Sequence, residues 1–169
     1  MKSIRTKILE QMKNTIMNSG VNAVLQRAGN DGYPVDCLNV LYEDEEFGFY
    51  ESDGEYFFSE QDEETGVSIF VSKITLTSDF PQKNIIDVMA ALGRLNEALP
   101  IGSWYLSDGT DSICFSVNVP IEADMSEDEL LDQVNISMGM AYYIAERFGG
   151  LLYQLATAKI SLEDFCDFF

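Results

Sequence analysis

Two amphipathic helices placed around a β-hairpin, within residues 78–150, constrain the fold of this chain more than any other feature. The first helix is expected between Pro81 and Pro100. Its apolar residues recur three and four positions apart, at Ile85, Val88, Met89, Leu92, Leu95 and Leu99. Pro81 suits a first helical turn, and Pro100 disfavours helical geometry in the residue before it. One face of this helix therefore needs a core to pack against.

The hairpin is expected at Asp108-Gly109. Asp-Gly between two alternating apolar runs favours a two-residue turn, because both turn residues need a positive φ. In that register Trp104 lies opposite Ile113, and its ring shares a sheet face with Phe115. The sequence therefore predicts that Trp104 is buried.

The second helix is expected over residues 126–148. It begins at a capping box, in which the Ser126 hydroxyl accepts from the Glu129 amide while the Glu129 side chain returns to Ser126. Its apolar stripe comprises Leu130, Val134, Met138, Ala141, Ala145 and Phe148. Gly149-Gly150 predicts the end of the helix.

A basic helix is expected at the N-terminus, over residues 2–18. Ile4, Ile8, Met12 and Ile16 lie on one side of it, and basic residues surround that side. Such a helix can lie on a membrane surface or dock on its own domain. Docking is the commoner arrangement and is the one we favour.

Strands are expected at residues 35–42, 47–52, 55–60 and 66–76. Asp53-Gly54 predicts a second tight hairpin turn, joining 47–52 to 55–60. In that register Phe49 faces Phe58, and Tyr50 faces Phe57, so both faces of the sheet carry aromatic rings. Either both faces are covered, which we favour, or one face exposes a binding patch.

These elements predict one α+β domain over residues 1–169, with an antiparallel sheet of five or six strands in the order α-βββ-α-ββ-α. A chain of 169 residues is long enough to bury a sizeable core. Residues 151–169 are expected to form a helical tail. Its last aromatic and aliphatic residues, Leu162, Phe165, Phe168 and Phe169, are expected to dock on the domain or on a partner.

The charge is strongly acidic, with 29 acidic and 10 basic residues and a net charge of −19. Such a chain repels nucleic-acid phosphates and anionic membranes, so neither is expected as a partner. A basic protein, a basic peptide or a cation is more compatible, although solubility alone explains the charge equally well. An acidic cluster at residues 43–64 fits solvated hairpin edges better than a calcium loop.

Residues suited to catalysis are scarce. The chain has no histidine, which removes imidazole metal sites and the usual acid–base group at neutral pH. No glycine-rich phosphate loop follows a strand, and Cys37, Cys114 and Cys166 lack metal-site spacing. We expect no enzymatic activity, no catalytic residue, no metal and no cofactor. No export signal and no run of 18 apolar residues is evident, so reduced cysteines and a cytoplasmic location are expected.

Several short motifs in this order resemble the YbjN-type family of bacterial sensory transduction regulators. They are Arg94-Leu95-Asn96, Gly102 opening an aromatic strand, Asp108-Gly109, Val119-Pro120 and the cap from Ser126 to Leu130. The similarity covers about residues 45–150, and no family catalytic residues come with it. It implies the fold of type III secretion chaperones and a bacterial protein, not an enzyme, that works by binding another protein.

Two hypotheses for function remain open from the sequence. The first is a chaperone-like or regulatory module that binds a protein or peptide, and a homodimer is compatible with it. Its expected surface lies beside the acidic run and comprises Phe47, Phe49, Tyr50, Tyr56 and Phe57. The second is a small-molecule or cation-binding domain, or an unrecognised enzyme, with a pocket between the sheet and the long helix.

Overall fold

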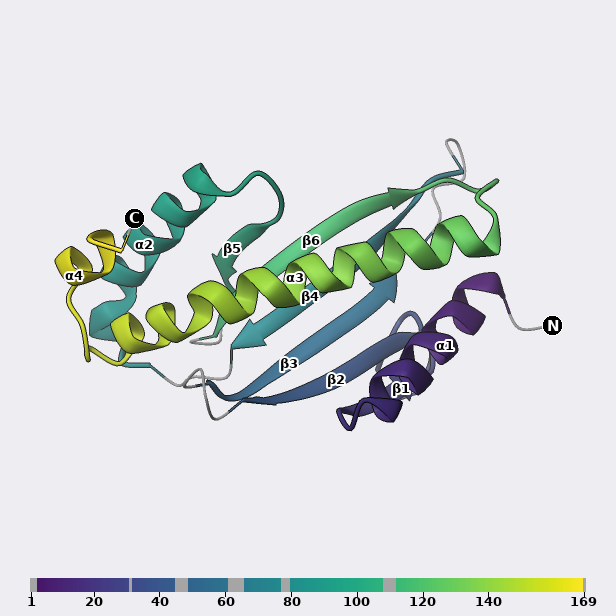
Figure 1. Ribbon diagram of the computed structural model, residues 1–169, viewed down its shortest axis with the longest axis horizontal. Coiled ribbons are helices and arrows are strands. Elements are labelled where there is room, and N and C mark those ends of the chain that lie inside the picture. Colours follow the sequence, from purple (N-terminus) through teal and green to yellow (C-terminus); the bar gives the residue numbers. More distant parts are fainter. Residues whose placement is uncertain are drawn as a thin grey trace.

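A computed structural model shows helices packed on one face of an antiparallel sheet (Figure 1). It describes residues 3–30, 32–44, 49–60, 66–76, 80–107 and 112–168, and only the backbone of residues 43, 44 and 49–51. The α+β class and the antiparallel sheet are therefore confirmed.

The sheet has six strands in the order β1-β2-β3-β4-β6-β5, and every pair of neighbours is antiparallel. The strands are β1 (Asn22–Gln26), β2 (Cys37–Asp44), β3 (Phe49–Phe58), β4 (Ser68–Leu76), β5 (Ser103–Leu106) and β6 (Ile113–Ile121). The sequence did not predict β1, which pairs with β2 at one edge of the sheet. Four strands precede the second helix, as the six-stranded alternative allows, but β1 is one of them and the single strand β3 replaces the two strands expected at 47–52 and 55–60.

The turn predicted at Asp53-Gly54 is wrong, because both residues lie in the middle of the continuous strand β3. Gly54 pairs with Val40 on one side and with Ile74 on the other. A Cβ atom at Gly54 would lie 2.7 Å from Cε2 of Tyr56 and 2.8 Å from Cε2 of Tyr42. The glycine is thus explained by the close approach of two rings, and the predicted Phe49–Phe58 and Tyr50–Phe57 pairs do not form because all four residues share one strand.

The helices are α1 (Ile4–Asn18), the short 3₁₀ helix η1 (Gln82–Asn84), α2 (Ile85–Ala98), α3 (Glu127–Ala156) and α4 (Leu162–Cys166). The predicted docking of the N-terminal helix is confirmed, since Ile8, Leu9 and Met12 of α1 are buried in the core. The tail also docks on its own domain. Phe165 of α4 is fully buried in the core that α2 and α3 share.

Helix α3 has 30 residues and lies across the sheet, spanning about 45 Å at 1.5 Å per residue (Figure 1). Its capping box is confirmed at Ser126 and Glu129. The end predicted at Gly149-Gly150 is wrong, because the helix continues to Ala156. Leu152, Leu155 and Ala156 of the added turns are buried, and this burial offsets the cost of about 1 kcal/mol for each glycine in a helix.

The hairpin of β5 and β6 has the predicted faces but a different register. Trp104 pairs with Phe115 instead of Ile113, and its ring centroid lies 4.9 Å from that of Phe115. A shift of two residues keeps each side chain on its face, because side chains alternate along a strand. Trp104 is therefore 2% exposed, as predicted. The predicted Asp108-Gly109 turn lies outside the described residues.

Candidate functional site

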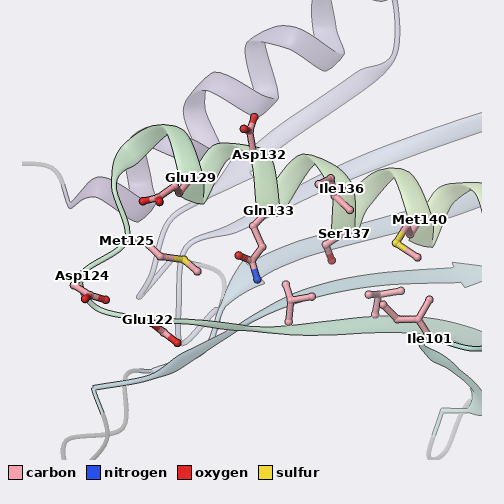
Figure 2. A pocket seen from close by; sticks show the side chains of 12 residues that line it. Ile101, Glu122, Asp124, Met125, Glu129, Asp132, Gln133, Ile136, Ser137 and Met140 are labelled. Carbon is pink, nitrogen blue, oxygen red and sulfur yellow. The ribbon is translucent and has the colours of Figure 1, made fainter.

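A groove lies between the N-terminal half of α3 and the strand β6 (Figure 2). It forms because β5 pairs only with Ile113 to Ser116 of β6, so no described strand flanks the rest of β6 on this side. The volume of the groove is about 710 Å³. The sequence-based alternative of a pocket between the sheet and the long helix corresponds to this place.

The floor of the groove is apolar and comes from three separate parts of the chain. It comprises Ile101 from the α2–β5 connection, Val117 and Val119 from β6, and Met125, Ile136 and Met140 from α3 and the residues before it. The side chain of Ile136 is 62% exposed, although it lies in a helix otherwise packed on the sheet. The groove therefore offers apolar surface that the fold itself leaves in contact with water.

Carboxylates surround one end of the groove. They are Glu122 and Asp124, after β6, and Glu129, in the first turn of α3. Asp132, about one turn further along α3, also lines the groove, but its side chain points away from β6 (Figure 2). Glu122, Asp124 and Glu129 lie at the end of the groove away from Ile101 (Figure 2). Hydrogen bonds from the hydroxyl and the N–H of Ser126 lower the pKa of Glu129, which favours its charged form. None of the twelve described lining residues is basic.

Two polar side chains of α3 fix the helix against the sheet along the groove. The Ser137 hydroxyl lies 2.8 Å from that of Ser72 in β4, and both side chains are buried. Gln133 donates from Nε2 to the carbonyl oxygen of Pro120 at 3.3 Å. These contacts hold α3 beside β6, so the groove is a preformed feature of the fold.

Of the five residues predicted to bind a partner, the structure describes the side chains of two, and these lie on opposite faces of the sheet. Tyr56 is fully buried beneath the helices, and its hydroxyl lies 2.6 Å from that of Tyr42. Burial raises the pKa of Tyr56 well above its ordinary value and that of Tyr42 to about 12. Phe57 is half-buried on the opposite face of the sheet. The side chains of Phe49 and Tyr50, and all of Phe47, lie outside the described residues.

Neither a protein family nor a curated protein matches this sequence. Among solved structures, YbjN from E. coli, a proposed transcription regulator, is similar with a TM-score of 0.49 and 8% sequence identity. That comparison covers 83% of this chain and 90% of the other. A likeness this weak carries no argument about this chain, and membership of the YbjN-type family stays a prediction.

The other face of the sheet has no described helix on it and carries a polar surface. At its centre Lys73 donates to Glu55 at 2.5 Å. Burial has the largest single effect on Lys73 and lowers its pKa, but the hydrogen bond to Glu55 and the nearby negative charge together exceed it, so the pKa of Lys73 is raised. Beside this pair, Cys37 and Phe57 line a hollow of about 430 Å³ together with the Tyr33–Val35 segment. This face holds Phe57 and is separate from the groove.

The described part of the chain contains neither a candidate metal site nor a candidate membrane-spanning helix. No three His, Cys, Asp or Glu side chains gather there in a way that could hold a metal ion. Among the helices that the structure describes, none combines the length and apolar content needed to cross a lipid bilayer.

The sequence contained a signal for the groove that the single-stripe interpretation of α3 missed. Ile136, Met140 and Tyr143 are spaced four and three residues apart, which places a second apolar row on the helix beside the buried one. Two apolar rows on one helix predict two packing partners. The sheet is the partner of the first row, and Ile136 and Met140 of the second row line the groove.

Proposed function

We propose that this protein is a non-enzymatic module that binds a segment of another protein in the groove between α3 and β6. The segment carries apolar side chains next to lysine or arginine residues. The observation that carries the proposal is the continuous groove in which an apolar floor meets four carboxylates and no base among its described lining residues. Apolar burial supplies affinity, and the carboxylates select and steer a cationic partner.

A small molecule is the second candidate for the same groove. The volume of about 710 Å³ lies within the usual range for ligand pockets. Such pockets normally direct a few polar groups onto the ligand from several sides, whereas the charged groups here gather at one end. This distribution favours a peptide segment with one cationic and one apolar part.

The surface predicted from the sequence around Phe47, Phe49, Tyr50 and Phe57 stays a separate hypothesis for protein binding. Phe57 faces away from α3, so a partner on that surface would not occupy the groove. Substitution of Phe57 therefore serves as a control for binding in the groove.

The experiment selects peptides from a random library on the full chain and measures their affinity by fluorescence anisotropy. We expect the selected peptides to combine apolar residues with lysine or arginine. A variant with Glu122→Gln, Asp124→Asn and Asp132→Asn should bind them about tenfold more weakly at physiological salt. Glu129 is left unchanged because it belongs to the helix cap.

A matched variant controls for net charge. Asp87→Asn, Glu97→Gln and Asp167→Asn also remove three negative charges, at exposed positions outside the groove. Its affinity should stay within about twofold of the parent, because charges beyond the Debye length of about 8 Å at physiological salt are screened. If both charge variants weaken binding equally, or if Ile136→Gln leaves it unchanged, the groove is not the binding site.

A further inference from the structure

The helices on the sheet leave a position beside the N-terminal half of α3 without a neighbouring helix in the described part of the chain. On one side, α1 packs near Leu130 and Val134, in the N-terminal half of α3. On the other side, α2 packs near Ile144 and Leu152, in its C-terminal half (Figure 1). The groove lies beside the N-terminal half on the α2 side. It is where a further helix would complete the layer.

The edge of β6 is poorly suited to accept an extra strand. Ser107 donates from its N–H to the carbonyl of Ser112, and backbone groups alternate along a strand, so Cys114, Ser116, Asn118 and Pro120 face the β5 side. Pro120 has no N–H, and its carbonyl accepts from Gln133. Beyond β5, only Asn118 offers both a donor and an acceptor on this side of β6.

The outer edge of β5 is also occupied. Asn96 of α2 donates from Nδ2 to the carbonyl of Trp104 at 2.9 Å and accepts from its N–H at 2.8 Å. At this end of the sheet, a partner that binds by strand addition would therefore gain few backbone hydrogen bonds. Side-chain contacts must supply the affinity instead.

The groove wall suits a helix as its occupant. Ile136 and Met140 line the groove one helical turn apart, and Tyr143 continues their row along α3 beyond the groove. Ile136 and Tyr143 are 62% and 56% exposed. The lining residues of α3 extend from Glu129 to Met140, which is about 16 Å or three helical turns. Rows of this kind interlock with the side chains of a second helix.

We propose, building on the function proposed above, that the bound segment docks as an amphipathic helix of about three turns along the N-terminal half of α3. Its apolar face covers Ile136, Met140 and Val119. Its basic residues lie at the end of the groove that holds Glu122, Asp124 and Glu129. The segment adds a helix to the layer and does not extend the sheet.

The test uses the full chain and two labelled peptides of about 14 residues, near the length at which a helix becomes marginally stable in water. Both contain leucine and lysine in the same proportions. One places leucine at three- and four-residue intervals, and the other alternates the two residues. We expect the helical-period peptide to bind at least about tenfold more tightly and to gain helical circular dichroism on binding.

Three variants locate the binding and distinguish the outcomes. Ile136→Gln should weaken binding of the helical-period peptide, and Ile86→Gln, an exposed isoleucine on α2, should not. Pro120→Ala restores an N–H to the β6 edge and should leave the affinity unchanged. If the alternating peptide binds as tightly and Pro120→Ala strengthens it, strand addition is correct and the helix is refuted, while the groove remains the site. If neither peptide responds to Ile136→Gln, binding in the groove itself is refuted.

Discussion

At the residue scale, the packing of neighbouring side chains at Gly54 leaves no room for any residue larger than glycine. Gly54→Ala would place a methyl group 2.7 Å from the ring of Tyr56, which is fully buried and cannot move aside. We expect the free energy of unfolding to fall by about 1–3 kcal/mol. Gly139→Ala in α3 is the control, since its Cβ would meet nothing within 4 Å. That substitution should raise stability by up to about 1 kcal/mol. Equal effects in urea unfolding would contradict this account of Gly54.

The hydroxyl pair of Tyr42 and Tyr56 predicts a loss of stability at alkaline pH. Burial raises the pKa of Tyr42 from 10.0 to about 12, so the folded state keeps a proton that the unfolded chain releases. The free energy of unfolding should therefore fall as the pH rises from about 10 to about 12. Tyr42→Phe should make this slope shallower, measured by urea unfolding at a series of pH values.

Cys37 contributes to the same alkaline range and is removed for this comparison. Burial raises the pKa of its thiol from 9.0 to about 11, so it also lowers stability as the pH rises. The Tyr42→Phe comparison is therefore made with Cys37→Ala in both proteins. An unchanged slope in that pair would show that Tyr42 is not responsible.

At the element scale, α4 and the residues that follow it give a matched pair of phenylalanines. Phe165 is fully buried, whereas Phe168 is 64% exposed. Phe165→Ala should lower the free energy of unfolding by about 3–5 kcal/mol, because it leaves a cavity beneath α4. Phe168→Ala should change it by no more than about 0.5 kcal/mol. A similar loss for both, measured by chemical denaturation, would show that α4 does not dock as described.

At the scale of the whole molecule, the net charge of −19 should make the fold sensitive to salt. Like charges repel in the compact state, and sodium chloride shortens the Debye length from about 30 Å at 0.01 M to about 8 Å at 0.15 M. We expect the melting temperature to rise over this range. The control variant with Asp87→Asn, Glu97→Gln and Asp167→Asn should gain less. If the melting temperature did not change with salt, repulsion between the acidic residues would not be lowering the stability of the fold.

The sequence by itself determined the features that depend on near neighbours in the chain. Helical spacing located α2 and the start of α3, and the Ser126 capping box marked the first residue of α3. Alternation placed Trp104 on its correct face, although the register was two residues off. The α3 side of the groove could also be predicted from the sequence, because Ile136 and Met140 form a second apolar row on that helix. Each of these follows from a backbone period or a cap, which contacts within a few residues decide.

Only the tertiary structure decided the features that depend on distant residues. Gly54 lies in a strand because it pairs with Val40 and Ile74, and a glycine is needed there because the rings of Tyr42 and Tyr56 occupy the space of a side chain. Local turn propensity does not report either contact. Gly149 stays helical because the turns beyond it are buried against α2 and α4. The groove exists because β5 is shorter than β6 and α2 packs on the other half of α3, so its floor joins Ile101, Val119 and Ile136. Burial summed over such distant contacts outweighs local preferences of about 1 kcal/mol.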